Sequence, residues 1–158
     1  MPSQVTVRPI AASDFEAWLP LWAGYNKFYG RSGSTALADD ITRMTWSRIL
    51  DATAPIHSVV AESDEHGVVG IANYVVHEST GALTPVCYLQ DLFVDPTVRA
   101  HGVGRQLLEW LFVEAAVQNW SRLYWQTRED NYRARALYDR FTPHSGFVRY
   151  VLTVPSIV

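Results

Sequence analysis

The sequence has little that would indicate a metal centre, a disulfide framework or a membrane span. Cys87 is the only cysteine, so neither an intramolecular disulfide nor a cysteine-cluster zinc site can form. The five histidines lack the spacing of metal ligands, and we expect no metal. No apolar run reaches the roughly 20 residues that cross a bilayer, and the N-terminus lacks the apolar core of a signal peptide. We therefore expect a cytoplasmic protein with no membrane partner.

An excess of charge of one sign is also missing. The formal net charge of −3 gives no broad attraction for nucleic acid, which is therefore not an expected partner. Acidic groups near a pocket would instead suit a cationic substrate. Apolar residues are plentiful, because 48% of the 158 residues are hydrophobic and 18% are charged. This balance is typical of a globular chain with a real core, and we expect one domain, 1–158.

Strands and helices are expected to alternate along the chain. Runs of β-branched residues and period-two alternation predict strands at 5–9, 59–62, 68–76, 86–94, 122–127 and 147–154. Helical periodicity predicts one helix that begins after Ser13 or Asp14 and others at 36–50, 103–119 and 131–141. Because the helix 103–119 joins strands 86–94 and 122–127, these strands should be parallel, with a right-handed crossover. The expected fold class is α/β: a single mixed sheet flanked by helices, with a parallel β-α-β unit.

The first two helices are predicted from their apolar stripes. The first would bury Phe15, Trp18, Leu19, Leu21 and Trp22. The second, capped by Thr35, would turn Leu37, Ile41, Met44 and Ile49 inward. The segment 25–34 between them is aromatic and then rich in turn residues, so we expect it to leave the first helix and form a loop.

A short basic loop before the helix 103–119 is the most informative segment. It reads Arg99-Ala100-His101-Gly102-Val103-Gly104-Arg105. Because Gly102 and Gly104 lack Cβ, the backbone can turn sharply and approach a ligand while the N–H groups of the helix start point outward. The helix dipole and these donors favour a phosphate or pyrophosphate, and Arg99 and Arg105 add positive charge. The pattern is neither a three-glycine dinucleotide fingerprint nor a P-loop.

A second motif follows later in the chain. Residues Asn131-Tyr132-Arg133-Ala134-Arg135-Ala136-Leu137-Tyr138 fit the pattern N-x-x-A-x-x-L-Y, and Gly146-Phe147 comes after them. Together with Arg-x-x-Gly-x-Gly at 99–104, this motif resembles the GNAT superfamily of N-acetyltransferases over residues 87–150. The segment 88–104 also resembles spermidine/spermine N-acetyltransferase, and 123–138 resembles fungal and bacterial GNAT enzymes that act on small amines. The resemblance implies acetyl-CoA as co-substrate.

The resemblance also implies a set of contacts to acetyl-CoA. The loop would hold the pyrophosphate, the backbone of 92–94 would align the pantetheine arm and polarise the thioester carbonyl, and Asn131 would touch the co-substrate. The residues expected there are Leu92, Phe93, Val94, Arg99, Ala100, His101, Gly102, Val103, Gly104, Arg105, Asn131 and Ala134.

Acetyl transfer to an amine needs a base for the ammonium, stabilisation of the oxyanion and an acid for the leaving thiolate. Tyr138 matches the family position that protonates the thiolate, and a phenol with a pKa of about 10 is protonated at pH 7. At the glutamate position of the polyamine enzymes this chain has Gln90, which cannot accept a proton. Asp91 should face the other side of a regular strand, unless a bulge redirects it. Three roles stay open for Asp91: a base, a substrate-positioning group, or only the partner of a basic group. Glu78, Tyr88 and a water chain are the other candidates for the base.

Aromatic side chains are the expected walls of the acceptor site, because they bind alkyl amines through apolar contact and cation–π attraction. These residues are Tyr25, Phe28, Tyr29 and Trp125. Cys87 has no evident activating partner, which disfavours an acetyl-cysteine step.

The predicted function is direct transfer of an acetyl group from acetyl-CoA to the primary amine of a small molecule. Three alternatives stay open: acetylation of a lysine or N-terminus in a protein or peptide, a catalytically inactive acyl-CoA-binding sensor, and a nucleotide-binding regulatory module. The strand 147–154 would expose an edge suited to pairing with a second chain, so we expect a homodimer.

Overall fold

The computed structural model describes residues 3–98 and 101–157, which fall into two compact units, Met1–Gln126 and Thr127–Val158. Each unit is described by itself. The first contains strands β1 (Val5–Pro9), β2 (Ile56–Ser63), β3 (Gly67–His77), β4 (Val86–Val94) and β5 (Leu123–Tyr124), and helices α1 (Phe15–Phe28), α2 (Asp39–Leu50) and α3 (Val103–Val117). The second contains α4 (Tyr132–Tyr138).

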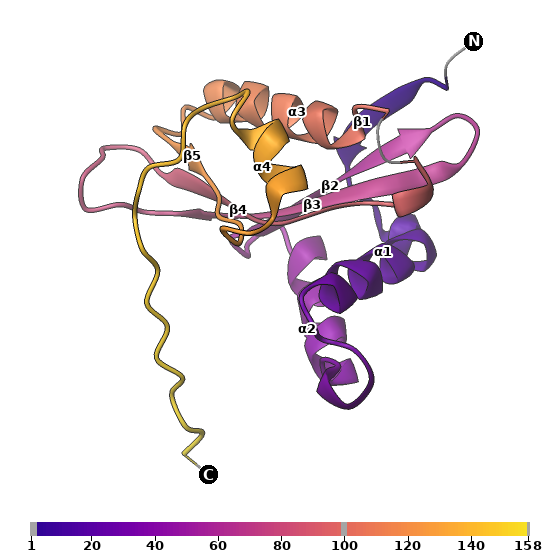
Figure 1. Ribbon diagram of the computed structural model, residues 1–158, viewed down its shortest axis with the longest axis horizontal. Coiled ribbons are helices and arrows are strands. Elements are labelled where there is room, and N and C mark those ends of the chain that lie inside the picture. Colours follow the sequence, from indigo (N-terminus) through magenta and orange to yellow (C-terminus); the bar gives the residue numbers. More distant parts are fainter. Residues whose placement is uncertain (1–2, 99–100, 158) are drawn as a thin grey trace. The chain divides into compact units, whose positions relative to one another are not determined.

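One mixed sheet organises the first unit, with strand order β1-β2-β3-β4-β5 (Figure 1). Neighbouring strands from β1 to β4 are antiparallel, and β4 and β5 are parallel. The helix α3 connects this parallel pair, so the predicted β-α-β unit and the predicted α/β class are confirmed. The turn Asp64–His66 joins β2 to β3, which pair as an antiparallel hairpin.

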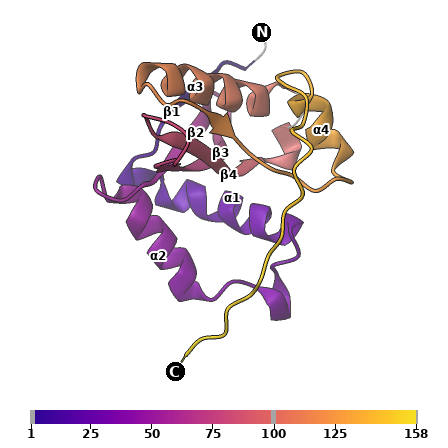
Figure 2. The same ribbon diagram turned by 90° about the vertical axis from the view of Figure 1, so that its left-hand side faces the viewer.

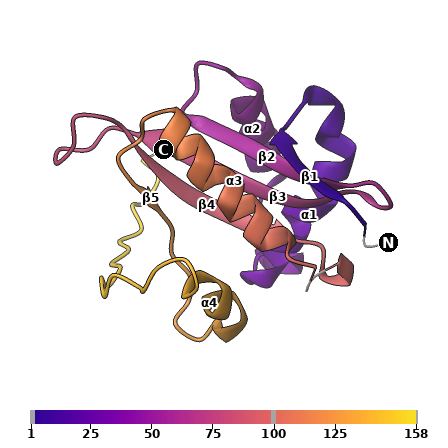
Figure 3. The same cartoon turned by 90° about the horizontal axis from the view of Figure 1, so that it is seen from above.

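Helices cover both faces of this sheet. Figure 2 shows α1 and α2 on one face and α3 on the other, and Figure 3 shows α3 lying along the strands. On the α1 face, aromatic rings make up much of the core; Trp18 is fully buried and stacks on Trp22, with ring centroids 5.3 Å apart. The α3 face is aliphatic, with Val103, Leu107 and Leu111 all buried.

The first two helices differ from the prediction in three ways, two at their boundaries and one in burial. The first helix continues to Phe28, so Tyr25 is a helical core residue and the loop begins later than predicted. Leu19 is 39% exposed, because only the stripe through Trp18 and Trp22 faces the sheet. The prediction that Thr35 caps the second helix is wrong, because α2 begins at Asp39 and the Thr35 hydroxyl is bonded within the preceding turn.

The predicted inner face of α2 is only partly right. Ile49 is buried and Leu37 packs against the core, but Ile41 and Met44 are about half exposed. Because α2 contacts the sheet mainly at β2, a narrower stripe of the helix is covered than its apolar pattern predicts.

The C-terminal part departs most from the prediction. β5 has two residues instead of six, and α4 is shorter than the predicted helix 131–141. The prediction of a strand at 147–154 is wrong for the described residues, because this segment joins no ladder and its apolar side chains are exposed. A strand forms only where a neighbour completes its backbone hydrogen bonds, and the second unit contains a single short helix and no strand among its described residues.

Candidate active site

A β-bulge at Gln90 determines which side chains β4 presents. In the β3–β4 ladder Asn73 pairs with Asp91, whereas the next residue, Tyr74, pairs with Leu89. Gln90 is therefore the extra residue of the bulge, and its side chain is exposed. Since side chains normally alternate along a strand, the insertion reverses the alternation beyond this point.

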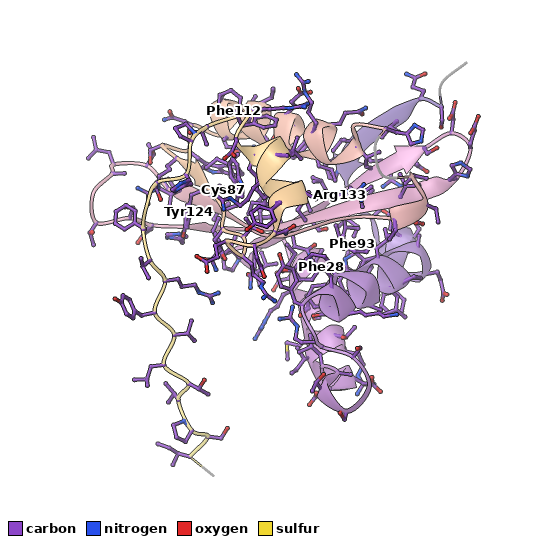
Figure 4. All side chains as sticks on the ribbon, viewed as in Figure 1. Phe28, Cys87, Phe93, Phe112, Tyr124 and Arg133 are labelled. Atoms are coloured by element: carbon purple, nitrogen blue, oxygen red, sulfur yellow. The ribbon has the colours of Figure 1, made fainter. Side chains whose placement is uncertain are left out.

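The bulge places Asp91 on the sheet face covered by α1. Its carboxylate accepts a hydrogen bond from Asn73 Nδ2 at 3.1 Å. The Tyr25 hydroxyl of α1 lies within reach of both Asp91 and the Gln90 carbonyl, 3.3 Å from the latter, and can give its single proton to either. Phe93, two residues along, faces Gly24 of α1 and is labelled in Figure 4. The condition set by the sequence, that only a bulge could redirect Asp91, is met.

Burial controls the protonation of this group. Asp91 is 7% exposed, and burial raises its pKa although hydrogen bonds from Asn73 and Tyr25 and the charge of Arg31 act in the opposite direction. The pKa of Tyr25 is also raised, mainly by burial and then by the nearby Asp91 charge, so this phenol stays a hydrogen-bond donor. A carboxylate with a raised pKa is a better proton acceptor at neutral pH than an exposed one.

Two residues of this cluster were not predicted from the sequence. Asn73 is 2% exposed, and its Oδ1 has no hydrogen-bond partner among the described protein atoms. Arg31 lies with its guanidinium carbon 5.7 Å from the Tyr25 ring centroid and 5.9 Å from that of Tyr29. A signal existed only for Asn73, a lone polar residue inside the apolar run 68–76.

The predicted acceptor residues are only partly brought together. Tyr25 and Tyr29 are adjacent, with ring centroids 5.0 Å apart, and Phe28 packs its edge against Tyr29 but is 53% exposed. Figure 4 labels Phe28 at the α1 side of the sheet. Trp125 instead follows β5 and is half-buried.

The start of α3 has the geometry expected of an anion-binding turn. Gly102 has φ +75°, a left-handed conformation that favours glycine, and its carbonyl accepts the first helical bond, from Gln106 N at 3.0 Å. The N–H groups of Val103, Gly104 and Arg105 precede this bond, so the helix itself offers them no acceptor. His101 is exposed. Arg99 and Ala100 lie outside the described residues.

Two further predicted contacts have defined surroundings. Arg105 Nε donates to Glu109 Oε1 at 2.7 Å, an exposed pair one helical turn apart. The parallel ladder contains only Cys87 with Leu123 and Tyr88 with Tyr124, and β4 continues beyond it through Leu92, Phe93 and Val94. The segment predicted to align a pantetheine arm therefore extends past the end of the β4–β5 ladder.

The motif residues of the second unit share one face of α4. Asn131 caps the helix, because its Oδ1 accepts from Ala134 N at 3.4 Å while its Nδ2 donates to Thr127 Oγ1 at 2.9 Å. Ala134 and Tyr138 follow at spacings of three and four residues and are half-buried, as residues on one helical face are. Asn131 thus has a structural role besides its predicted contact with the co-substrate.

Cys87 has the surroundings of an unreactive thiol. Its side chain is fully buried, and burial raises the pKa of the thiol to about 12. The thiolate is therefore scarce at neutral pH, in agreement with direct transfer. Among the described residues no three histidine, cysteine or acidic side chains gather as metal ligands, and no helix is both long and apolar enough to span a membrane.

Residues 18–142 match the model of the Acetyltransferase (GNAT) family. This match covers most of the chain, so the protein belongs to the GNAT family and is an acyltransferase that uses acetyl-CoA. The co-substrate fits the structure, because the turn at Gly102 exposes helix N–H donors to a pyrophosphate.

Two similar proteins cover nearly the whole chain. The D-amino-acid N-acetyltransferase HPA3 of Saccharomyces cerevisiae is 30% identical over 148 residues, which are 93% of this chain and 89% of that protein. The uncharacterized N-acetyltransferase YhfO of Bacillus subtilis is 31% identical over 157 residues, which are 96% and 99% of the two chains.

The fold is shared with solved acetyltransferases. A probable acetyltransferase aligns with a TM-score of 0.81 at 21% identity, over 96% of this chain and 99% of that one. AAC(6')-Iy, solved with the bisubstrate analogue CoA-S-monomethyl-acetylneamine, aligns with a TM-score of 0.79 at 19% identity, over 97% and 100%.

Proposed function

We propose that the protein moves the acetyl group of acetyl-CoA directly to the primary amine of a small molecule. The observation that carries this proposal is the pair of buried acceptors on the α1 face, the Asp91 carboxylate and the Asn73 Oδ1 atom. A buried acceptor without a donor is costly, and an ammonium N–H would satisfy it. The polyamine-enzyme resemblance, and the D-amino-acid substrate in the name of the similar yeast protein, support a small-molecule acceptor.

In this proposal Asp91 is the base. Its carboxylate takes one proton from the substrate ammonium, and the amine lone pair then forms the new N–C bond. The bulge supports this assignment because it puts Asp91 beside Tyr25 and gives the carboxylate a buried position with a raised pKa. Gln90 would contribute its carbonyl, which orients the Tyr25 hydroxyl.

Tyr138 is proposed as the acid. Acetyl-CoA supplies the acetyl group as a thioester, and the phenol of Tyr138 gives its proton to the sulfur as the C–S bond breaks. The second proton that the substrate nitrogen loses as the amide forms restores the phenol. The support is the motif that ends at Tyr138 and the helical face that this residue shares with Asn131 and Ala134. The N–H donors at the start of α3 and the backbone of 92–94 are proposed to hold the co-substrate.

The test is continuous detection of the free coenzyme A thiol, with acetyl-CoA and separate panels of polyamines, amino acids, aminoglycosides and lysine peptides. Steady turnover with at least one small amine, lost in Asp91→Asn, supports the proposal. Turnover with peptides alone would favour protein acetylation. Binding of acetyl-CoA without turnover by any acceptor would favour the sensor alternative.

We also propose a homodimer. Its support is the C-terminal segment 147–154, whose strand-like sequence has exposed apolar side chains, with Phe147, Tyr150 and Leu152 each at least 90% exposed. Such a segment gains stability by joining a sheet edge or covering an apolar surface. Sedimentation as a 17.8 kDa monomer at tens of micromolar would contradict the proposal. The cytoplasmic location remains a prediction, which microscopy of a fluorescent fusion would test.

A further inference from the structure

Arg31 is held rigidly beside the candidate base by the end of α1. The helix closes at Gly30, which has φ +78°, and the Arg31 N–H returns to the Asn26 carbonyl at 2.8 Å. These bonds form a Schellman motif, which fixes the backbone of the residue that follows the glycine. The end of the helix therefore fixes the position of the Arg31 backbone and of its Cβ.

The side chain of Arg31 is also held. Its Nε donates to Asn26 Oδ1 at 2.7 Å, and Asn26 is itself buried, with its Nδ2 bonded to the Trp22 carbonyl at 2.9 Å. The guanidinium lies against the rings of Tyr25 and Tyr29, at 5.7 Å and 5.9 Å. The two rings orient the guanidinium plane, and the hydrogen bond fixes its Nε. The two terminal nitrogens are therefore left as donors with a defined direction.

These terminal nitrogens have no carboxylate within 4.0 Å among the residues that the structure describes. Asp91 senses the positive charge but does not form an ion pair with it. A planar guanidinium with two adjacent donors matches the two oxygens of a carboxylate. The arrangement is thus a prepared site for an anionic group next to the site proposed for the ammonium.

The opposite charges of Asp91 and Arg31 favour amines that also carry a negative group. A plain alkylammonium or a polyamine placed at Asp91 would meet the positive charge of Arg31, which is unfavourable. An α-amino acid carries a carboxylate one carbon from its ammonium, so it can present its cation to Asp91 and Asn73 and its anion to Arg31. The zwitterion matches both charges of the site.

We infer that Arg31 binds the carboxylate of the acceptor, and that the acceptor is an α-amino acid or another amine with an adjacent carboxylate. This inference rests on the proposed function, since it places the reacting amine at Asp91. Arg31 is a specificity residue and takes no part in proton transfer.

The experiment compares three kinds of acceptor with the same benzyl group: phenylalanine, which has the carboxylate, phenylalaninamide, in which it is an amide, and phenethylamine, which lacks it; the acid and the amide are each tested as both enantiomers. Release of free coenzyme A gives kcat and KM for each. We expect wild-type kcat/KM to favour one phenylalanine enantiomer over the amide and the amine by about 10- to 100-fold, the range for losing a charge-assisted hydrogen-bond pair. Equal kcat/KM for all three acceptors would overturn the inference without any variant.

Substitutions at Arg31 give the second readout. Arg31→Gln should raise KM for phenylalanine by about 10- to 100-fold at nearly constant kcat, and should leave the amide and amine within about threefold. Arg31→Lys keeps the charge without the planar fork and should fall between the two proteins. A uniform change for all acceptors would show that Arg31 only supports the fold, and would overturn the inference.

Arg122→Gln is the matched control, because Arg122 also lies over a tyrosine ring, 5.3 Å from the centroid of Tyr124, beside β5. It should keep the wild-type preference for the acid, and an equal loss of preference in this control would count against Arg31. Failure of the proposed function has a different signature, which is no turnover with any small amine. Thermal melting of each variant verifies that it is folded.

Discussion

Replacement of Asp91 by asparagine should separate stability from activity. The two side chains have nearly the same shape, so Asn73 and Tyr25 can still donate to the remaining oxygen. The fold is therefore expected to survive.

The sign of the stability change follows from the pKa of Asp91. Burial raises this pKa despite three favourable interactions, so the ionised carboxylate has a net cost in the folded state. That cost is absent below the unfolded pKa of about 3.9 and is complete above the raised folded pKa. The free energy of unfolding of Asp91→Asn should thus exceed that of the wild type at pH 8, and the difference should shrink as the pH falls toward 4.

Activity should change in the opposite direction. Without a carboxylate the ammonium has no proton acceptor on this face, and kcat should fall by about 10²- to 10⁴-fold, the usual contribution of a general base. Urea unfolding at two pH values and thiol-release kinetics measure the two effects. Glu78→Gln, at an exposed acid also considered as the base, is the control and should keep kcat. Wild-type kcat in Asp91→Asn, with chemistry limiting the rate, would refute the assignment.

Three further substitutions test other parts of the molecule. Tyr138→Phe removes one hydroxyl from a half-buried ring, so it should lower kcat by roughly 10²-fold and leave acetyl-CoA affinity intact by calorimetry; an unchanged kcat would make Tyr138 a packing residue. Gly104→Val should weaken acetyl-CoA binding more than it lowers the melting temperature, and unchanged affinity would remove Gly104 from the site. Asp14→Ala breaks the bidentate pair with Arg8 at 2.8 Å and 2.9 Å and should cost about 2–3 kcal/mol by urea unfolding at pH 7. Because Arg8 lowers the pKa of Asp14, this stabilisation is present above pH about 4 and is lost as the pH falls through the lowered pKa, so wild type and variant should converge in acid.

The sequence predicts best the elements that pack one face against the core, because such packing leaves a regular pattern of apolar residues. β1 and β4 have the predicted bounds, and α3 starts at the predicted residue. For β4 and α3 the reason is that each lies against a covered face whose alternation or stripe is visible in the chain. The segment 147–154 has a similar pattern, yet a pattern cannot reveal whether a partner strand is present. Local propensity alone therefore predicted a strand where the described chain has none.

The site shows the same division. The turn at the start of α3 was predictable because Gly102 and the following helix are contiguous in the chain. The cluster around Asp91 was not, because its members come from α1, the loop after α1, β3 and β4, and meet only once a single inserted residue reverses the alternation of β4. The insertion at Gln90 cannot be recognised in the sequence, yet it moves every later side chain of β4 to the opposite face of the sheet.

Gly70 of β3 sets how closely α3 approaches the sheet. A Cβ at this position would lie 3.1 Å from Val103 Cγ1 and 3.2 Å from Leu107 Cδ1, so a side chain here would press on two side chains that α3 packs against the sheet, and they would have to give by a few tenths of an ångström. The donors proposed for the pyrophosphate are on that same turn. A substitution at Gly70 in the core can therefore change the affinity for the co-substrate by shifting the start of α3. The co-substrate site can evolve in this way without any change in the loop proposed to bind the ligand.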